Sequence, residues 1–222
     1  MNKPTLFYVV IILFLCGLTL AGCRQTGLHL PAAGQRTSGE LLFEDDFSNP
    51  PNGWGTMEKD GGEIEFAYDG LMFSVFLPNF MYWSVNGKEY NDARIEVDAV
   101  LADGSLNDNF GIICRFKDDS NFYGFLLSHD GYYGIIKYVD GKMSMVSNEG
   151  NMGFSEAIRP GGVVNHLQVT CKGNLLRLSA NDTLLAEVVD DSFVSGKAGL
   201  IAGAYNEPGV MVFFDNFKVF QP

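Results

Sequence analysis

The chain has 222 residues, 46% of them hydrophobic, and a formal net charge of −12 that results from 15 Lys and Arg against 27 Asp and Glu. No Lys/Arg cluster offsets this acidic balance, which argues against a nucleic-acid partner and against docking on anionic lipid headgroups. The length fits one domain with a sizeable core.

The first element along the chain is an apolar run at residues 6–20, which follows Lys3 and ends in small residues before Cys23. As a helix, this run would span about 22 Å, at about 1.5 Å per residue, whereas the hydrocarbon core of a bilayer is ~30 Å thick. The run is therefore typical of the apolar region of a signal peptide, and we predict a signal peptide at residues 1–22.

Residues 20–23, Leu-Ala-Gly-Cys, resemble the lipobox of bacterial lipoproteins. The resemblance implies that Cys23 becomes the acylated first residue of the mature chain and that its acyl chains, palmitate among them, anchor the protein in a membrane. The alternative is a plain secretory signal with an incidental cysteine. Arg24 stands where an aspartate would signal inner-membrane retention, so we expect the extracytoplasmic side of the cell envelope, at the outer membrane if the cell has one.

Residues 23–40 are rich in Gly, Pro, Ser and Thr and show no sustained periodicity, which predicts a flexible tether. From residue 41 the chain reads as aromatic and β-branched runs separated by Asp-Gly, Asn-Gly and Gly-Asn pairs. Strands are expected within residues 61–70, 71–77, 81–90, 92–104, 109–121, 122–131, 132–142, 163–174, 175–191, 196–205 and 210–220. No stretch has a helical apolar stripe over three turns. The prediction is an all-β domain at 41–222, a two-sheet antiparallel sandwich or jelly roll.

The middle of the domain allows a register to be predicted. If "KDDSN" and "HDG" are hairpin turns, then Arg115, Tyr123 and Lys137 form one cross-strand row. The opposite face, with Phe116, Phe122 and Tyr138, is almost wholly apolar. We therefore expect the apolar face to be the core and the mixed face to meet a ligand.

Alternation in "HLQVTCK" directs Cys171 inward, and the predicted register directs Cys114 inward as well. Exported proteins reside in a compartment that permits disulfides. A Cys114–Cys171 disulfide is the hypothesis, and the alternative is two buried thiols that pack as small hydrophobes.

Four strings resemble the concanavalin A-like lectin/glucanase jelly roll, and more closely its bacterial laminin G-like and keto-disaccharide hydrolase-type domains. They are "LLFEDDFSNPPNGW", "GIICRF", "NFYGFLLSHDGYYGIIKY" and "GKAGLIAGAYNEPGVMVFFDNFKVF". The resemblance covers residues 41–222 and implies a concanavalin A-like fold. It implies no single function, because this scaffold hosts lectins, glycosidases and protein-binding modules.

A catalytic site of the resembling glucanases would need two glutamates and an aspartate at alternating positions of one strand. In "RIEVDAVLAD", Glu96 and Asp98 alternate correctly, but Val100 and Leu101 stand where the third carboxylate would be needed. We expect Glu96 and Asp98 to lie on a solvent-facing side of their strand. Whether the protein is an enzyme stays uncertain, with a non-catalytic role favoured.

A structural calcium ion is the one cofactor considered. By alternation along the last strand, Asp215 is expected to share its face with Phe213, Phe217 and Val219, and a carboxylate on such a face is costly unless it is paired, hydrogen-bonded or metal-bound. In the resembling glucanases, a last-strand aspartate binds calcium together with main-chain oxygens of the N-terminal segment and of a glycine turn. The positions implied here are Asp215, Glu44, Asp46 and Gly70. The alternative is that backbone N–H groups cap the Asp215 carboxylate.

Sugar binding needs aromatic platforms surrounded by polar groups. The candidates are Tyr82, Trp83, Tyr90, Arg115, Tyr123, Tyr133, Lys137 and Tyr205. The row of Arg115, Tyr123 and Lys137 is the best cluster among them, and its alternative is a cross-strand ladder that stiffens the sheet. We predict a lipid-anchored extracytoplasmic binding module for a glycan or an extracellular protein. A sugar-cleaving hydrolase and a structural envelope protein that packs on another protein are the alternatives.

Overall fold

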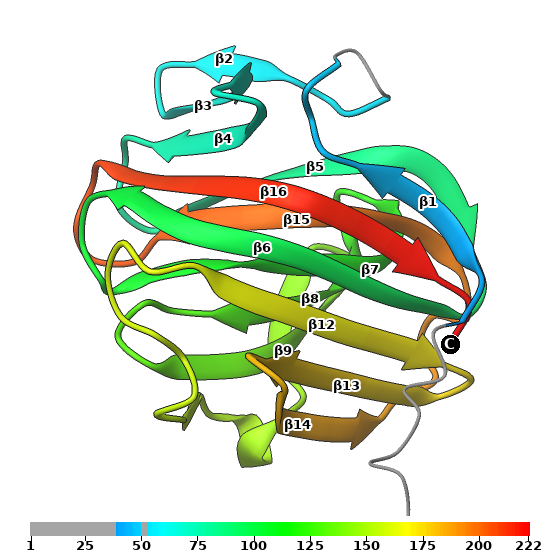
Figure 1. The fold of residues 1–222 in the computed structure, drawn as a ribbon. Coiled ribbons are helices and arrows are strands. Elements are labelled where there is room, and N and C mark those ends of the chain that lie inside the picture. The colour runs from blue at the N-terminus through cyan, green and yellow to red at the C-terminus, as the bar shows by residue number, and fades with distance from the viewer. Residues whose placement is uncertain (1–38, 50–52) are drawn as a thin grey trace, which may run out of the picture. The chain divides into compact units, whose positions relative to one another are not determined.

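The computed structural model describes residues 39–49 and 53–222 (Figure 1). These residues form two antiparallel sheets and only one short helical turn, Asn148–Gly150, so the predicted all-β sandwich is confirmed. Within this part of the chain no helix is long and apolar enough to cross a membrane. The signal peptide, Cys23 and most of the tether lie outside the described residues, and their assignment stays a prediction.

The larger sheet has nine strands in the order β14-β13-β12-β6-β16-β4-β3-β2, with β1 beside β16. Its long central strands β6 and β16 run side by side across the molecule (Figure 1). The strands of this sheet are β1 (Leu41–Asp45), β2 (Met57–Lys59), β3 (Gly62–Ala67), β4 (Gly70–Val75), β6 (Ala93–Asp103), β12 (Asn165–Lys172), β13 (Leu175–Ala180), β14 (Thr183–Val189) and β16 (Val210–Phe220).

The smaller sheet has seven strands in the order β10-β9-β8-β7-β15-β5, with β11 beside β9. Its strands are β5 (Phe80–Tyr90), β7 (Asp108–Asp118), β8 (Asn121–Leu127), β9 (Tyr132–Val139), β10 (Lys142–Met145), β11 (Gly153–Phe154) and β15 (Gly196–Ala204). The turns β4–β5, β6–β7, β8–β9 and β15–β16 lie at one end of the sandwich, on the left in Figure 1. We call this the turn end.

The core lies between the two sheets and follows the period-two alternation of the strands. On β6, Ile95 and Val97 are fully buried, whereas Glu96 and Asp98, which alternate with them, are partly exposed. This confirms that Glu96 and Asp98 lie on the outer side of their strand. Burial of this apolar surface is the main term that holds the sheets together, at ~25 cal/mol per Å².

Cys114 on β7 and Cys171 on β12 are both buried and form a disulfide that links the two sheets, with a Cα–Cα distance of 6.9 Å. The link closes a loop of 57 residues. It fixes the two sheets to each other near the start of β6, where Cys171 pairs with Ala93.

The structure corrects the predicted register at β7. Strands β8 and β9 pair as predicted, with Tyr123 opposite Lys137. On β7, however, Cys114 rather than Arg115 lies opposite Tyr123, because a bulge begins after Cys114 and Arg115 takes a positive φ of 56°. A one-residue slip of this kind exchanges the two faces of a strand.

On β8 and β9 the structure also reverses the predicted core face, whereas Cys114 of β7 points into the core as predicted. Tyr123, Phe125 and Ile135 of the mixed face are fully buried between the sheets. Phe122 and Ile136 lie instead on the outer side of the seven-stranded sheet, in a second apolar cluster. Both faces of this sheet are rich in apolar residues, so composition did not distinguish them.

We predict that replacing Cys114 and Cys171 by alanine lowers the free energy of unfolding by about 2–4 kcal/mol, because the 57-residue loop regains its entropy in the unfolded chain. Urea denaturation followed by tryptophan fluorescence measures this. A change under about 0.5 kcal/mol would show that the disulfide contributes nothing to stability.

Candidate functional site

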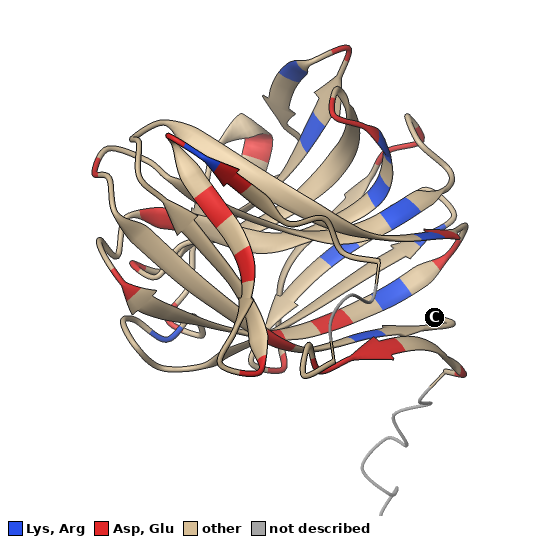
Figure 2. Cartoon of the chain, turned by 90° about the horizontal axis from the view of Figure 1, so that it is seen from above, with Lys and Arg blue, Asp and Glu red and all other residues tan. Residues whose placement is uncertain are grey.

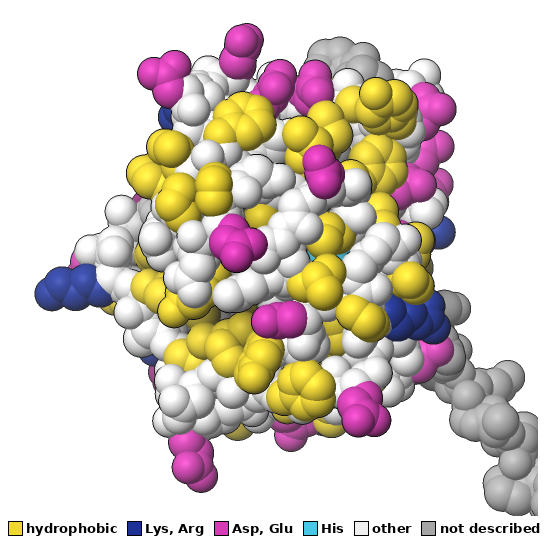
Figure 3. All heavy atoms as spheres, turned by 90° about the vertical axis from the view of Figure 1, so that its left-hand side faces the viewer, with side chains coloured by type: hydrophobic (Ala, Val, Ile, Leu, Met, Phe, Trp, Pro, Cys, Tyr) yellow, Lys and Arg dark blue, Asp and Glu magenta, His cyan; other side chains and the backbone are white. Residues whose placement is uncertain are grey.

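A pocket of about 690 Å³ lies on the outer face of the seven-stranded sheet, at the turn end. Its volume is within the range of small-molecule sites. Figure 3 looks onto the turn end, where hydrophobic and acidic side chains are interspersed over the surface. The lining residues are Asn79, Met81, Asn107, Asp108, Asn109, Leu126, Ser128, Asp130, Tyr132, Ile136, Met143, Met145, Met152, Ala204 and Tyr205.

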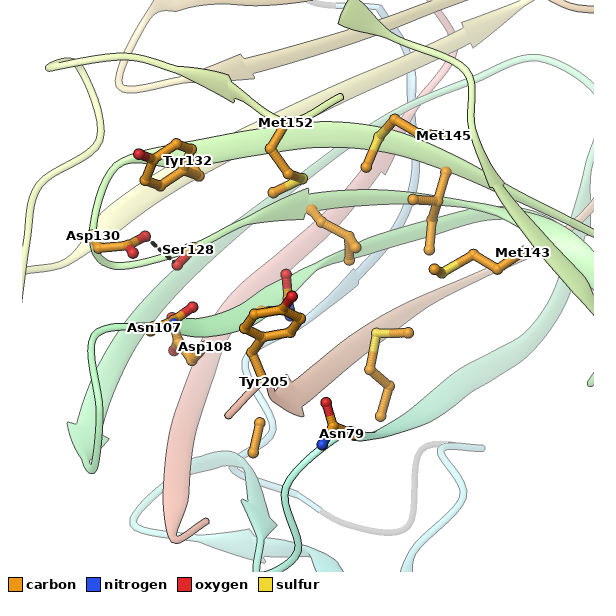
Figure 4. A pocket seen from close by; sticks show the side chains of 15 residues that line it. Asn79, Asn107, Asp108, Ser128, Asp130, Tyr132, Met143, Met145, Met152 and Tyr205 are labelled. Atoms are coloured by element: carbon orange, nitrogen blue, oxygen red, sulfur yellow. Dashed lines mark hydrogen bonds between the residues drawn. The ribbon is translucent and has the colours of Figure 1, made fainter. Parts of the chain in front are cut away.

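One side of the pocket is polar, and the tight β8–β9 turn builds much of it. The Ser128 N–H donates to the Tyr132 carbonyl at 2.9 Å, and Ser128 Oγ hydrogen-bonds to Asp130. Figure 4 shows Asp130, Ser128, Asn107 and Asp108 grouped on this side. The β8–β9 turn therefore presents carboxylate and hydroxyl groups to the cavity, and the β6–β7 turn adds the amide of Asn107.

Asp108 is held rigidly behind this polar side. Its two carboxylate oxygens accept hydrogen bonds from the His129 N–H at 2.9 Å and from His129 Nδ1 at 2.7 Å. Burial raises the pKa of Asp108, and the hydrogen bonds from His129 oppose that shift. His129 is itself fully buried and stacks on Phe110, and its Nε2 has no hydrogen-bond partner among the described residues. The pair fixes the β6–β7 and β8–β9 turns to each other.

Asn79 reaches the pocket from the β4–β5 turn. Its backbone has a positive φ of 61°, a conformation that asparagine tolerates better than most residues. Its N–H lies 2.9 Å from the carbonyl oxygens of both Ala204 and Tyr205. This contact holds the β4–β5 turn against the end of β15 and places the Asn79 amide beside Tyr205.

The other side of the pocket is lined by methionines. Met81, Met143, Met145 and Met152 come from β5, β10 and the chain after β10. Two glycines make room for them, because a Cβ at Gly134 would lie 2.6 Å from Met145 Sδ and one at Gly203 would lie 2.4 Å from Met81 Cγ. The methionines therefore rest directly on the backbone of the sheet.

The pocket has no cationic side chain among its described lining residues, whereas Asp108 and Asp130 both line it. Seen from above, most Lys and Arg residues lie toward the opposite end of the sandwich, and the turn end carries mainly Asp and Glu (Figure 2). The site thus disfavours anionic ligands and suits neutral or cationic ones.

The best predicted ligand cluster lies elsewhere. Arg115 and Tyr123 are only 2% and 0% exposed, so they cannot meet a surface ligand. Arg115 donates to the Phe193 carbonyl at 2.7 Å, and Lys137 Nζ lies 2.6 Å from Asp190. These side chains fix the segment between β14 and β15 against the inner face of the seven-stranded sheet. The register shift at β7 and the reversed faces of β8 turn Arg115 and Tyr123 inward, and the row therefore lies away from the pocket.

Electrostatics agree with this structural role. Burial raises the pKa of Tyr123 to about 12, and the hydrogen bond to the Asp190 carboxylate adds to the shift. At Asp190, burial acts in the opposite direction, but hydrogen bonds from Lys137, Tyr123 and Ser192 outweigh it and hold the pKa below its usual value. Tyr123 and Lys137 thus both bind the Asp190 carboxylate and hold it against the seven-stranded sheet.

Four other predicted aromatic residues lie outside the pocket. Tyr82, Tyr90 and Tyr133 are half-buried and pack against the main core. Trp83 belongs to the outer apolar cluster, and its Nε1 donates to Asp119 at 2.9 Å. Of the predicted candidates, Tyr205 does line the pocket, and 52% of its surface is exposed.

The residues implied for calcium come together only in part. Burial is the main cause that raises the pKa of Asp215. The nearby carboxylates of Asp46 and of Asp69, the residue before Gly70, add to the shift. The Asp215 carboxylate accepts the Asn216 N–H at 2.6 Å, which corresponds to the capped alternative. The strand has a bulge at Asn216, which changes the alternation of its side chains. Asp215 therefore faces outward and Phe217 faces inward, on opposite faces of the strand.

The remaining implied ligands do not complete a cation site. Asp46 is exposed and capped by Ser48, Glu44 is exposed on β1, and the Phe213 ring lies over Gly70. In the described part of the chain no three His, Cys, Asp or Glu side chains form a group that could hold a metal ion. The side chains of the described residues therefore do not by themselves form a calcium site. Calcium binding at Asp215 stays a prediction.

The glucanase carboxylates are likewise occupied by structural contacts. Glu96 lies 3.1 Å from Arg94, and Asp98 accepts from His166 Nδ1 at 2.8 Å and from Asn216 at 3.0 Å. They lie on the nine-stranded sheet, on the other side of the core from the pocket.

No protein-family model matches the sequence, and no curated protein matches it. The fold, however, is similar to solved structures. A carbohydrate-binding module, CBM66, from Bacillus subtilis superposes with a TM-score of 0.61 at 18% identity, over 76% of this chain and 96% of the module. A protein of unknown function with a galectin-like fold from Bacillus subtilis gives 0.62 at 14% identity, over 83% of this chain and 97% of its own.

A β-glucanase from Bacillus licheniformis gives a TM-score of 0.58 at 9% identity, over 83% of this chain and 99% of the enzyme. At such low identity these similarities define the class of fold, a concanavalin A-like or galectin-like β-sandwich, and nothing finer. The function has to be argued from the pocket.

The sequence analysis missed most of the pocket. Its polar residues lie in turns, and its methionines lie on a face that we expected to be the core. The closest signal in the sequence is the pair Met143 and Met145, which alternate on one strand and follow the strand of Gly134 by one hairpin. That Met145 lies beside Gly134 becomes clear only from the pairing of β10 with β9.

We predict that Asp215→Asn raises the melting temperature in chelator at neutral pH by about 1–2 °C. A raised carboxyl pKa in the folded state means that ionisation costs stability, and this cost appears as the pH rises above the unfolded value of about 3.9. The gain should therefore vanish below that pH. Glu58→Gln, at an exposed position of β2, is the control in scanning fluorimetry.

Calcium added to the same samples tests the predicted ion. If calcium binds here, it raises the melting temperature of the wild type and not that of Asp215→Asn. An equal effect on both proteins, or none on either, would contradict a calcium site at Asp215.

Proposed function

We propose that this protein is a non-catalytic binding module for neutral glycans, held in the cell envelope by acylated Cys23, with the pocket at the turn end as its binding site. The observation that carries the proposal is the composition of the pocket, in which the carboxylate, hydroxyl and amide groups of Asp130, Ser128 and Asn107 line one side. Groups of this kind are suited to hydrogen-bond sugar hydroxyls.

Two tyrosines at the polar side support the same ligand class. Tyr205 and Tyr132 expose 52% and 45% of their surfaces and line the cavity from separate turns. Tyr132 is braced by an edge contact with Phe154 at 5.5 Å. A pyranose ring has an apolar face that packs well on such rings. The similarity of the fold to a carbohydrate-binding module agrees with this assignment.

The position of the termini is compatible with a lipid anchor. The Gln221 N–H donates to the Glu40 carbonyl at 2.8 Å, so the start of the described domain lies beside its C-terminus. This place is on the right in Figure 1, whereas the turn end is on the left. A tether that enters there leaves the pocket at the far end of the domain.

A glycoside hydrolase is the second candidate, because two carboxylates line the same cavity in different environments. Asp108 is buried, and Asp130 is partly exposed. Both oxygens of Asp108 are already engaged by His129, which favours a structural role for it. We therefore keep binding as the proposed function.

The binding proposal predicts that Tyr205→Ala and Asp130→Ala each weaken glycan binding about tenfold or more, which corresponds to ~1.4 kcal/mol. The full-length protein in lipid nanodiscs is tested against an array of neutral oligosaccharides. Tyr68→Asn, which removes another exposed tyrosine from a turn with positive φ, is the matched control and should bind like the wild type.

Silence of the folded protein across the array would contradict a neutral glycan ligand and leave an extracellular protein partner as the next candidate. Release of new reducing ends by the wild type, and not by Asp130→Asn, would instead identify a hydrolase.

The lipid anchor predicts that Cys23→Ser abolishes labelling by an alkyne fatty acid in cells and shifts the protein out of the membrane fraction. Cys16→Ser changes a cysteine of the same signal segment and should leave both unaffected. Continued labelling of the Cys23→Ser protein, or an unlabelled wild type, would contradict the anchor.

A further inference from the structure

The non-polar side of the pocket identifies the ligand more narrowly, on the assumption that the pocket binds a glycan as proposed. In Figure 4, Met143 and Met145 lie on the side of the cavity away from Asp130, and Met152 lies between them and Tyr132. Ring stacking alone would be served by flat aromatic side chains. Thioethers offer a soft aliphatic surface instead, which suits a small methyl or acyl group.

The methionines are placed to adapt to such a group. Met145 and Met152 both lie over Gly134, whose missing Cβ would meet their sulfurs at 2.6 and 3.0 Å. Met143 at the edge is 55% exposed. Methionine has three rotatable bonds, so these side chains can fold over a substituent without moving the backbone of the sheet.

Charge excludes the other common glycan substituents. Among the described residues that line the pocket there is no Lys, Arg or His to pair with a carboxylate, sulfate or phosphate. Asp108 and Asp130 would repel such anions. The substituent that remains is neutral and apolar.

We infer that the pocket binds a neutral sugar that carries a short apolar substituent, an acyl group or a deoxy-sugar methyl. The sugar hydroxyls contact Asn107, Ser128 and Asp130, and the substituent lies on Met143, Met145 and Met152. Each methyl carbon buried there should strengthen binding roughly fourfold, which corresponds to ~0.8 kcal/mol.

Two matched pairs of neutral probes test the inference. They are acetylated against deacetylated xylotetraose, and L-rhamnose against L-mannose. The full-length protein in nanodiscs, free of detergent that could enter the pocket, is labelled with ¹³C at the methionine methyls, and affinities are read from the methyl resonances. In at least one pair, the substituted member should bind fourfold or more tightly and shift the resonances of Met143, Met145 and Met152.

Met145→Gln should remove this preference, so that the substituted and unsubstituted members of a pair bind within about twofold of each other. Met143→Gln, at a more exposed position, serves if Met145→Gln does not fold. Met72→Gln on the nine-stranded sheet is the matched control and should keep the preference.

The outcomes separate this inference from the proposed function. Equal affinities within both pairs, or a preference that survives in Met145→Gln, would overturn the inference that the methionines bind an apolar substituent. Glycan binding by the pocket would still stand. No binding of either member in either pair, together with a silent glycan array, would overturn both.

Discussion

The constraint on which the rest of the structure depends is that the seven-stranded sheet can pack only one of its two apolar faces against its partner sheet. The face with Tyr123, Phe125 and Ile135 is buried in the core, beside the Cys114–Cys171 disulfide. The opposite face keeps an apolar cluster of its own on the outside of the sandwich. The candidate site exists because this second face stays accessible at the turn end.

Each side of the sheet then performs a different task. Inside, Tyr123 and Lys137 hold Asp190, so their polar groups are used to fix a loop and are not available to a ligand. Outside, Gly134 and Gly203 lower the surface so that methionines lie on the backbone and a cavity forms beside the turns. A fold shared with modules and enzymes of several kinds acquires its specificity in such local features.

The charge of the molecule is consistent with this division. The formal charge of −12 is spread so that the turn end is mainly acidic, and the pocket includes Asp108 and Asp130. An acidic, partly apolar cavity disfavours anionic ligands. The acidity that argues against a nucleic-acid partner at the level of composition therefore recurs at the pocket.

The sequence by itself determined the all-β class, the two-sheet sandwich and the pairing of β8 with β9, because alternating apolar residues and Asp-Gly turns are local signals. It placed Tyr205 among the candidate ligands but could not place the methionines. The bulge at Arg115 shifts β7 by one residue, and the choice between two apolar faces depends on the shape of the opposing sheet. Only the tertiary structure decided the register of β7 and the face of the seven-stranded sheet that enters the core. Both depend on contacts between segments that are far apart in the chain.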